Sequence, residues 1–176
     1  MCLGADVSIG ALKLVLVTHD STDATRVRFA WVDDGSDIDL DALAHGARVT
    51  GYVVEERLQW DHGLPRSAVT RISFVRRRSG LTREQFADHW STEHAPLARR
   101  HHPALWRYVQ NVVIEPLTPD TPEVDGIAEL GFRTIDDLST RMYDSPEGMA
   151  IIRADVLRFI DVGAGWQVVT KNPSSP

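Results

Sequence analysis

The chain has 176 residues, of which 43% are apolar, 25% charged and 7% aromatic, a composition typical of a folded protein rather than a disordered or fibrous one. Its net charge of -6 argues against non-specific binding to nucleic acid or anionic lipid, because either would need a strongly basic face. The single cysteine, Cys2, excludes an intrachain disulfide and a thiolate cluster for a metal. Residues 1–10 lack the pattern of a secretory signal, and no stretch approaches the roughly 18 apolar residues that span a bilayer. We therefore expect a cytoplasmic protein with neither nucleic acid nor membrane as a partner.

The first part of the chain predicts three strands and a short helix. Residues 12–18 form an apolar, β-branched run that suits a strand buried on both faces. Residues 26–32 alternate between apolar and polar side chains, which indicates a second strand. A short helix over residues 40–45 and a third strand over residues 47–58 follow. Residues 59–68 have the composition of a linker.

The second part predicts the order strand, helix, strand, strand, helix, strand, which is the ferredoxin-like (split βαβ) motif of the α+β class. Its strands are expected over residues 69–77, 106–114, 126–132 and 165–170, and its last helical stretch over residues 147–160. Thr82 and Gln85 form a capping box that begins the first helix, and Thr134 caps the second. Because proline is costly in a helix interior, the first helix should end near Glu93 and a new turn should begin at Pro96.

Two arrangements of the first 64 residues are compatible with this pattern. Residues 26–56 repeat the order strand, helix, strand of residues 126–170, which predicts that residues 1–64 are a shortened copy of the domain at residues 65–176. Two antiparallel sheets would then pack face to face and bury their valine-rich strands. In the alternative, residues 1–64 are an N-terminal extension that adds strands to one sheet.

Three segments carry a resemblance to a known family: residues 71–77 (RISFVRR), 80–90 (GLTREQFADHW) and 93–98 (EHAPLA). With these motifs the chain resembles the EthD domain family, and the front third resembles the degenerate first copy of longer, tandem members. The resemblance implies antiparallel sheets packed as a dimeric-type α+β barrel, formed by a homodimer or by a pseudo-dimer within one chain. It also implies a role like that of the family members, which take part in ether degradation or are cofactor-independent enzymes that dehydrate, cyclise or oxidise aromatic polyketides.

Histidines are the first catalytic candidates, because imidazole gives and takes a proton near neutral pH. His94 lies at the expected bend before Pro96 and matches the His-Ala-Pro signature of the family, although a histidine there could also cap or pack under the next turn. His89 shares a helical face with aromatic residues, so it should point toward the core or a pocket. His101 and His102 precede a proline in a loop and should be exposed.

The substrate-binding candidates are mostly aromatic. Tyr108 could donate its phenol proton to a substrate carbonyl, although aromatic residues in strands are most often core. The remaining expected contacts with substrate are Trp90, Trp106, Gln110 and Phe132, with Arg76 as a site for an anionic group. Alternatively, this run of arginines at the end of a strand is a solvent-exposed charged surface without a binding role.

A metal site and an organic cofactor are not expected. His89 and His94 are five residues apart, whereas two helical ligands of one ion prefer a spacing of three or four. No dinucleotide-binding, phosphate-loop or serine hydrolase motif occurs in the sequence.

The leading hypothesis is a cofactor-independent enzyme that uses His94, helped by His89 or Tyr108, on a small apolar aromatic or polyketide-like substrate. Removal of a proton beside a carbonyl would lead to dehydration, cyclisation or oxidation. The alternatives are a non-catalytic accessory protein that holds a hydrophobic metabolite for a partner oxidase, and an interaction module whose pocket is filled by its own side chains.

Overall fold

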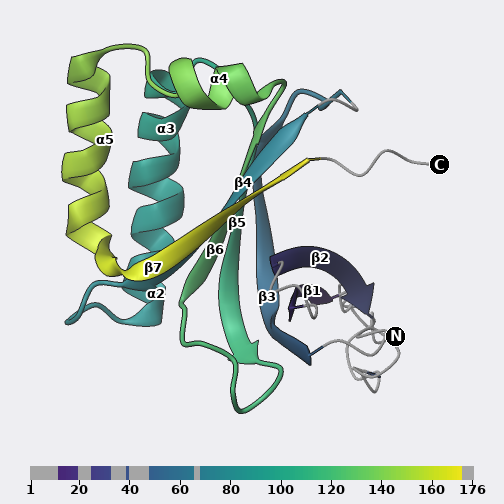
Figure 1. Ribbon diagram of the computed structural model, residues 1–176. Helices are drawn as coiled ribbons and strands as arrows, with labels where there is room; N and C mark the ends of the chain where they lie inside the picture. The colour runs from purple at the N-terminus through teal and green to yellow at the C-terminus, as the bar shows by residue number, and fades with distance from the viewer. Residues whose placement is uncertain (1–11, 20–24, 33–38, 40–47, 66–67, 172–176) are drawn as a thin grey trace, which may run out of the picture.

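The computed structural model describes residues 12–19, 25–32, 39, 48–65 and 68–171. Over these residues, the strands form one antiparallel, seven-stranded sheet in the order β2-β1-β3-β5-β6-β4-β7. The strands are β1 (Leu12–His19), β2 (Thr25–Val32), β3 (Arg48–Asp61), β4 (Val69–Arg77), β5 (Leu105–Pro116), β6 (Gly126–Phe132) and β7 (Ile160–Lys171). The helices are α2 (Arg83–His89), a π-helical turn η1 (Trp90–His94), α3 (Ala95–His101), α4 (Ile135–Thr140) and α5 (Pro146–Phe159). Helices α3 and α5 lie side by side against one face of the sheet (Figure 1).

Residues 69–171 follow the order strand, helix, strand, strand, helix, strand. Strands β4 and β6 begin and end at the predicted residues, and β6 pairs with both β4 and β5. In β4, Ile72 and Phe74 point into the core on the sheet face opposite the helices, while Val75 packs on the face that the helices cover. This alternation places every second side chain of β4 on the face that the helices cover.

The capping box of the first long helical segment is confirmed. The Thr82 hydroxyl accepts a hydrogen bond from the Gln85 backbone N–H at 3.2 Å, and the Gln85 side chain accepts one from the Thr82 N–H at 2.9 Å. The helical segment changes close to the predicted place, because η1 ends at His94 and α3 begins at Ala95, but η1 leads directly into α3 without a break. In η1 the Ala95 N–H bonds to the Trp90 carbonyl, five residues back, and Pro96 falls in the first turn of α3, where proline is tolerated.

The N-terminal strands continue the sheet of the second part instead of forming a separate sheet packed against it. The reason is that β3 pairs antiparallel with β5 from Tyr52 to Asp61, so the connection is edge to edge. Strand β3 also runs three residues into the predicted linker. The predicted helix over residues 40–45 lies outside the described residues.

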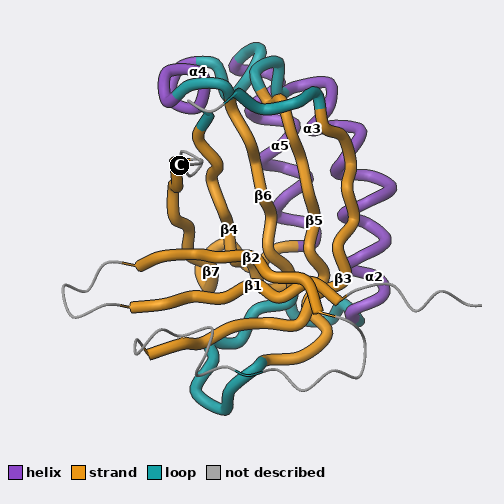
Figure 2. The backbone as a smooth tube through the Cα atoms, turned by 90° about the vertical axis from the view of Figure 1, so that its right-hand side faces the viewer, coloured by secondary structure: helices purple, strands orange, loops and turns teal. Residues whose placement is uncertain are grey.

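The sheet curls strongly, so that β1 and β2 cross in front of the face that the helices leave uncovered (Figure 2). Within the curl, buried side chains of β1 and β3, including Val15, Val17, Tyr52 and Val54, pack with Ile72 and Phe74 of β4. All side chains of β1 from Lys13 to Thr18 are buried, as expected for a strand covered on both faces. The described helices include none long and apolar enough to cross a membrane.

A buried lysine joins the N-terminal strands to the centre of the sheet. Lys13 of β1 is only 2% exposed, and its Nζ contacts the carboxylates of Glu56 on β3 and Glu129 on β6. Glu129 also accepts hydrogen bonds from Arg107 at 3.0 Å and from Asn111 at 2.9 Å. The charges are therefore compensated inside the curl, as buried charges must be.

We predict that Lys13→Met lowers the free energy of unfolding by about 3 kcal/mol, because it leaves the buried Glu129 with Arg107 as its one remaining cation and removes the cation beside Glu56. Urea denaturation of the full chain measures this. The matched control, Arg48→Met, removes one side of an exposed ion pair with Asp120 and should hardly move the unfolding midpoint. Equal effects of the two substitutions would contradict the docking of β1 described above.

Candidate functional site

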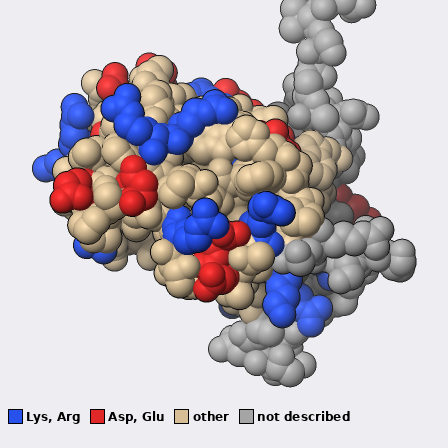
Figure 3. Space-filling model, turned by 90° about the horizontal axis from the view of Figure 1, so that it is seen from above, with Lys and Arg blue, Asp and Glu red and all other residues tan. Residues whose placement is uncertain are grey.

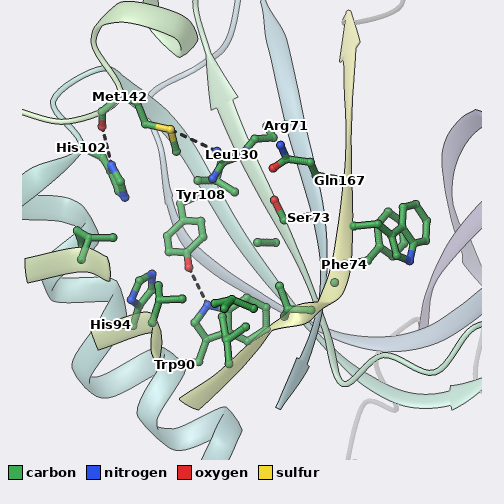
Figure 4. A pocket seen from close by; sticks show the side chains of 18 of the residues that line it. Arg71, Ser73, Phe74, Trp90, His94, His102, Tyr108, Leu130, Met142 and Gln167 are labelled. Carbon is green, nitrogen blue, oxygen red and sulfur yellow. Dashed lines mark hydrogen bonds between the residues drawn. The ribbon is translucent and has the colours of Figure 1, made fainter. Parts of the chain in front are cut away.

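A cavity of about 440 Å³ lies between the sheet and the helices (Figure 4). Its apolar wall includes Val75, Trp90, Leu130, Ile152 and Val156. Its polar lining includes Arg71, Ser73, His94, His102, Tyr108 and Gln167. A mostly apolar cavity with a few polar groups directed into it is the usual form of a small-molecule site.

A buried carboxylate, Asp155 of α5, lies between two imidazoles. Its Oδ1 is 2.8 Å from His89 Nε2, and its Oδ2 is 2.8 Å from His94 Nδ1. Burial alone would raise the pKa of Asp155, but the hydrogen bonds from His94 and His89 outweigh it and hold the pKa below its ordinary value. Asp155 is therefore an ionised group at neutral pH that both rings can use as an acceptor.

The π-helical turn explains how two histidines five residues apart reach one carboxylate. In a regular α-helix such residues would be separated by about 140° around the axis. A π-helical turn instead repeats every five residues along its hydrogen bonds, which brings His89 and His94 toward the same side. The π-helical turn thus brings together two side chains that their spacing in a regular α-helix would separate.

His94 presents its second nitrogen to the cavity. The ring is 7% exposed and lines the cavity, its Nδ1 is bonded to Asp155, and its Nε2 makes no hydrogen bond to any described residue. When the ring is neutral, Nδ1 carries the proton that Asp155 accepts, so Nε2 has a free lone pair. This is the arrangement in which a carboxylate orients a histidine that acts as a base.

Tyr108 has an unused proton beside this histidine. Its hydroxyl oxygen accepts hydrogen bonds from Trp90 Nε1 at 2.8 Å and from Gln110 Nε2 at 3.3 Å, and it donates to no described residue. Burial raises the pKa of Tyr108 to about 12, so the phenol stays protonated. Tyr108 can therefore donate a hydrogen bond to an oxygen atom of a ligand in the cavity.

His101 and His102 are not exposed, contrary to the expectation. His102 is 5% exposed and lines the cavity, and its Nδ1 donates to the carbonyl oxygen of Met142 at 2.6 Å. Burial lowers the pKa of His102 to about 4, so this ring is neutral at pH 7. The His101 side chain is 12% exposed and pairs with Asp144 at 3.0 Å. Both residues end α3 instead of lying in a free loop, which is why they are covered.

Two polar residues of β4 in the cavity were missed from the sequence. Arg71 Nε and Ser73 Oγ are both buried, and neither has a hydrogen-bond partner among the described residues. Within the described ranges, the one polar contact of the Arg71 side chain runs from Nη1 to the sulfur of Met142 at 3.3 Å. Burial lowers the pKa of Arg71. The alternation along β4 contained the signal, because Arg71 and Ser73 share the face of Val75, opposite Ile72 and Phe74.

The remaining predicted contacts are only partly brought together. Trp90 lines the cavity, and Gln110, 0% exposed, supports it by donating to the Trp90 carbonyl oxygen at 2.8 Å. Phe132 lies in the core and Arg76 pairs with Glu123 on the surface, so neither lines the cavity. Trp106 is also outside the cavity.

The misplacement of Trp106 has a specific cause. The pairing of β5 with β6 shifts register between Leu105 and Arg107, so Trp106 no longer shares the face of Tyr108. Its Nε1 instead donates to the carbonyl oxygens of His62 and Gly63. Asp155 was missed as well, although it stands alone as a charged residue on the face of α5 formed by Ile152, Val156 and Phe159.

Among the described residues, no group of three or more His, Cys, Asp or Glu is placed to hold a metal ion. His89 and His94 share a carboxylate and do not converge on one point with a third ligand.

We predict a pH dependence of stability that originates at His102. The folded protein binds a proton there only near pH 4, whereas the unfolded chain binds it near 6.5, so stability rises with pH across this window and is lost as the pH falls through it. The loss amounts to about 3 kcal/mol.

Urea midpoints measured from pH 7 to 4 should therefore fall less steeply for His102→Gln, whose amide can still donate to Met142, than for the wild type. Parallel curves would contradict the burial of a neutral His102. The contribution of Asp155, whose pKa the two histidines keep below the ordinary 3.8, lies beneath this window.

Comparison with known proteins gives a family match over part of the chain and solved structures of similar fold. Residues 78–163 match the model of the EthD domain. A solved anthrone oxidase-like protein is 11% identical, with a TM-score of 0.57 over 96% of this chain and 83% of that chain, which is a likeness of fold alone. An ethyl tert-butyl ether d (EthD) family protein from Bacillus halodurans is 19% identical, covers 60% of this chain and 99% of its own length, and has a TM-score of 0.47. No curated protein matches the chain. Residues 78–163 are thus similar to the EthD domain, and they lie in a structure with an antiparallel, curled sheet and helices on one face.

Proposed function

We propose that this protein is a cofactor-independent enzyme that removes a proton from a carbon beside the carbonyl group of a small, largely apolar aromatic or polyketide-like molecule. The observation that carries the proposal is the His94 ring, whose Nδ1 is held by the buried Asp155 and whose Nε2 is free at the cavity. Tyr108 lies in the same cavity with a proton to donate.

The residues divide the reaction between them. His94 Nε2 takes the proton from carbon, and the electron pair of the broken C–H bond forms a C=C bond while the carbonyl becomes an enolate. Asp155 stabilises the imidazolium that results, as a buried carboxylate does for a catalytic histidine. Tyr108 donates a hydrogen bond to the enolate oxygen, where the negative charge develops.

The proposed substrate class follows from the size of the cavity and the residues that line it. The volume of about 440 Å³ lies within the range of small-molecule sites, and Trp90, Leu130 and Ile152 offer apolar contacts. The enolate could then lose water, cyclise or react with dioxygen. Likeness to a protein described as anthrone oxidase-like favours the last outcome, and it makes anthrone, an aromatic ketone with an acidic C–H, a suitable probe.

The architecture proposed with this function is a ferredoxin-like unit at residues 69–171 whose sheet is completed by the N-terminal strands. Support comes from the strand order β5-β6-β4-β7 and from the apolar contacts of β1 and β3 with β4 inside the curl. A pseudo-dimeric barrel within one chain would result, in place of the barrel shared between two copies.

We predict that His94→Ala lowers turnover by at least about 100-fold with the fold intact, because the base is lost. Solvent deuterium incorporation at the acidic carbon of anthrone and oxygen uptake, both corrected for the reaction without enzyme, measure this. His62→Ala is the control, since His62 is exposed and packs on Trp106 outside the cavity. Unchanged turnover in His94→Ala would remove His94 from the mechanism. Tight binding of anthrone without any conversion by the wild type would support the accessory-protein alternative.

We predict that Asp155→Asn lowers kcat by roughly 100-fold or more while KM changes little, since the amide cannot stabilise the imidazolium and favours the wrong tautomer. The matched control is Asp144→Asn, which removes the carboxylate of a different aspartate and histidine pair. A similar kcat in both variants would show that Asp155 only supports the fold.

A further inference from the structure

The side of the cavity formed by β4 contains a cation without a counter-ion. Arg71 forms no ion pair with any described residue, its Nε is buried without a partner, and its single polar side-chain contact is with the neutral sulfur of Met142. Other arginines of the sheet have carboxylate partners, as Arg77 has Asp125 and Arg107 has Glu129. A partly buried guanidinium whose Nε is shielded from water and unpaired is costly, so an anion in the cavity would complete a site of this kind.

A second unsatisfied group lies on the same face of the same strand. Ser73 is two residues from Arg71, and its buried hydroxyl also has no partner. Gln167 of β7 pairs in register with Ser73 and lines the cavity beside it. Three donors, a guanidinium, a hydroxyl and an amide, therefore lie together, and no carboxylate in the part of the chain that the structure describes bonds to them.

The position of these donors relative to the histidine defines how a ligand would lie. Figure 4 shows Arg71, Ser73 and Gln167 on one side of the cavity and His94 on the other, with Tyr108 between them. A ligand anchored at β4 would extend across the apolar wall toward His94 and Tyr108. The fork of an arginine matches the two oxygens of a carboxylate, and a serine hydroxyl can add a third bond.

We propose that the substrate carries a carboxylate, which Arg71 and Ser73 bind at the β4 side of the cavity so that the acidic C–H of the same molecule meets His94. This rests on the proposed function for the role of His94 and adds to it the class of substrate, an aromatic carboxylic acid. Arg71 is a binding residue in this account and takes no part in the proton transfer.

Isothermal titration calorimetry of the full chain with 2-naphthoate and anthraquinone-2-carboxylate, each compared with its neutral amide, tests the proposal without any substitution. The carboxylate should bind at least about tenfold more tightly than the amide of the same ring system. Equal affinity, or no binding of either carboxylate, would overturn the proposal.

Two variants locate the selectivity. Arg71→Met should abolish the preference for carboxylate over amide, and Arg76→Met, which removes the same charge from the same strand but outside the cavity, should preserve it. A preference that survives in Arg71→Met would also overturn the proposal, and melting temperatures show whether each variant is folded.

Failure here is separable from failure of the proposed function. His94→Ala should still bind the carboxylates, because the anchor is untouched. Carboxylate selectivity without catalysis would refute the proposed enzymatic function and support the carboxylate site at Arg71 and Ser73. Turnover of neutral anthrone that depends on His94, without carboxylate selectivity, would refute the carboxylate site alone.

Discussion

The buried carboxylate of Asp155 is the constraint on which the rest of the site depends. An ionised group at 4% exposure is tolerated only when donors satisfy it, and here His89 and His94 each supply one ring nitrogen at 2.8 Å. This contact joins α5 to the helical segment α2-η1-α3 and determines which nitrogen of His94 is left for a ligand. The same interaction thus fixes a wall of the cavity and the chemistry that the cavity can perform.

The geometry of the helical segment follows from that constraint. The turn η1 brings two histidines, five residues apart, to one carboxylate, and it delivers the chain to Pro96 in a position that proline accepts. It also places Trp90 against Gly126 of β6, where a Cβ atom would lie 2.4 Å from the indole ring, so only glycine leaves room for this wall of the cavity. On the other face, the curl of the sheet buries Lys13 and the apolar residues of β1 and β3 (Figure 3 shows the charged side chains that remain outside, seen from above).

Much of the fold could be predicted from local patterns, whereas the site could be predicted only in part. Alternation and capping located β4, β6 and the start of α2, because these signals depend on neighbours in the sequence. The position of Trp106 depends on a register shift in β5, and the meeting of His89 and His94 depends on a π-helical turn. The pairing of β3 with β5 depends on contacts between residues that are distant in the sequence. None of these three is encoded by periodicity. Arg71 and Asp155 could have been found, since each is a charged residue on a face otherwise assigned to the interior.

The tautomers of the two histidines test the central claim most directly. Long-range ¹H–¹⁵N NMR spectra of the imidazole rings, assigned through His89→Gln and His94→Gln, report which nitrogen carries the proton in the neutral form. The account predicts a proton on Nδ1 of His94 and on Nε2 of His89, because these are the atoms that face Asp155. A neutral His94 with its proton on Nε2 would contradict the account, since that nitrogen could not then accept a proton from a substrate.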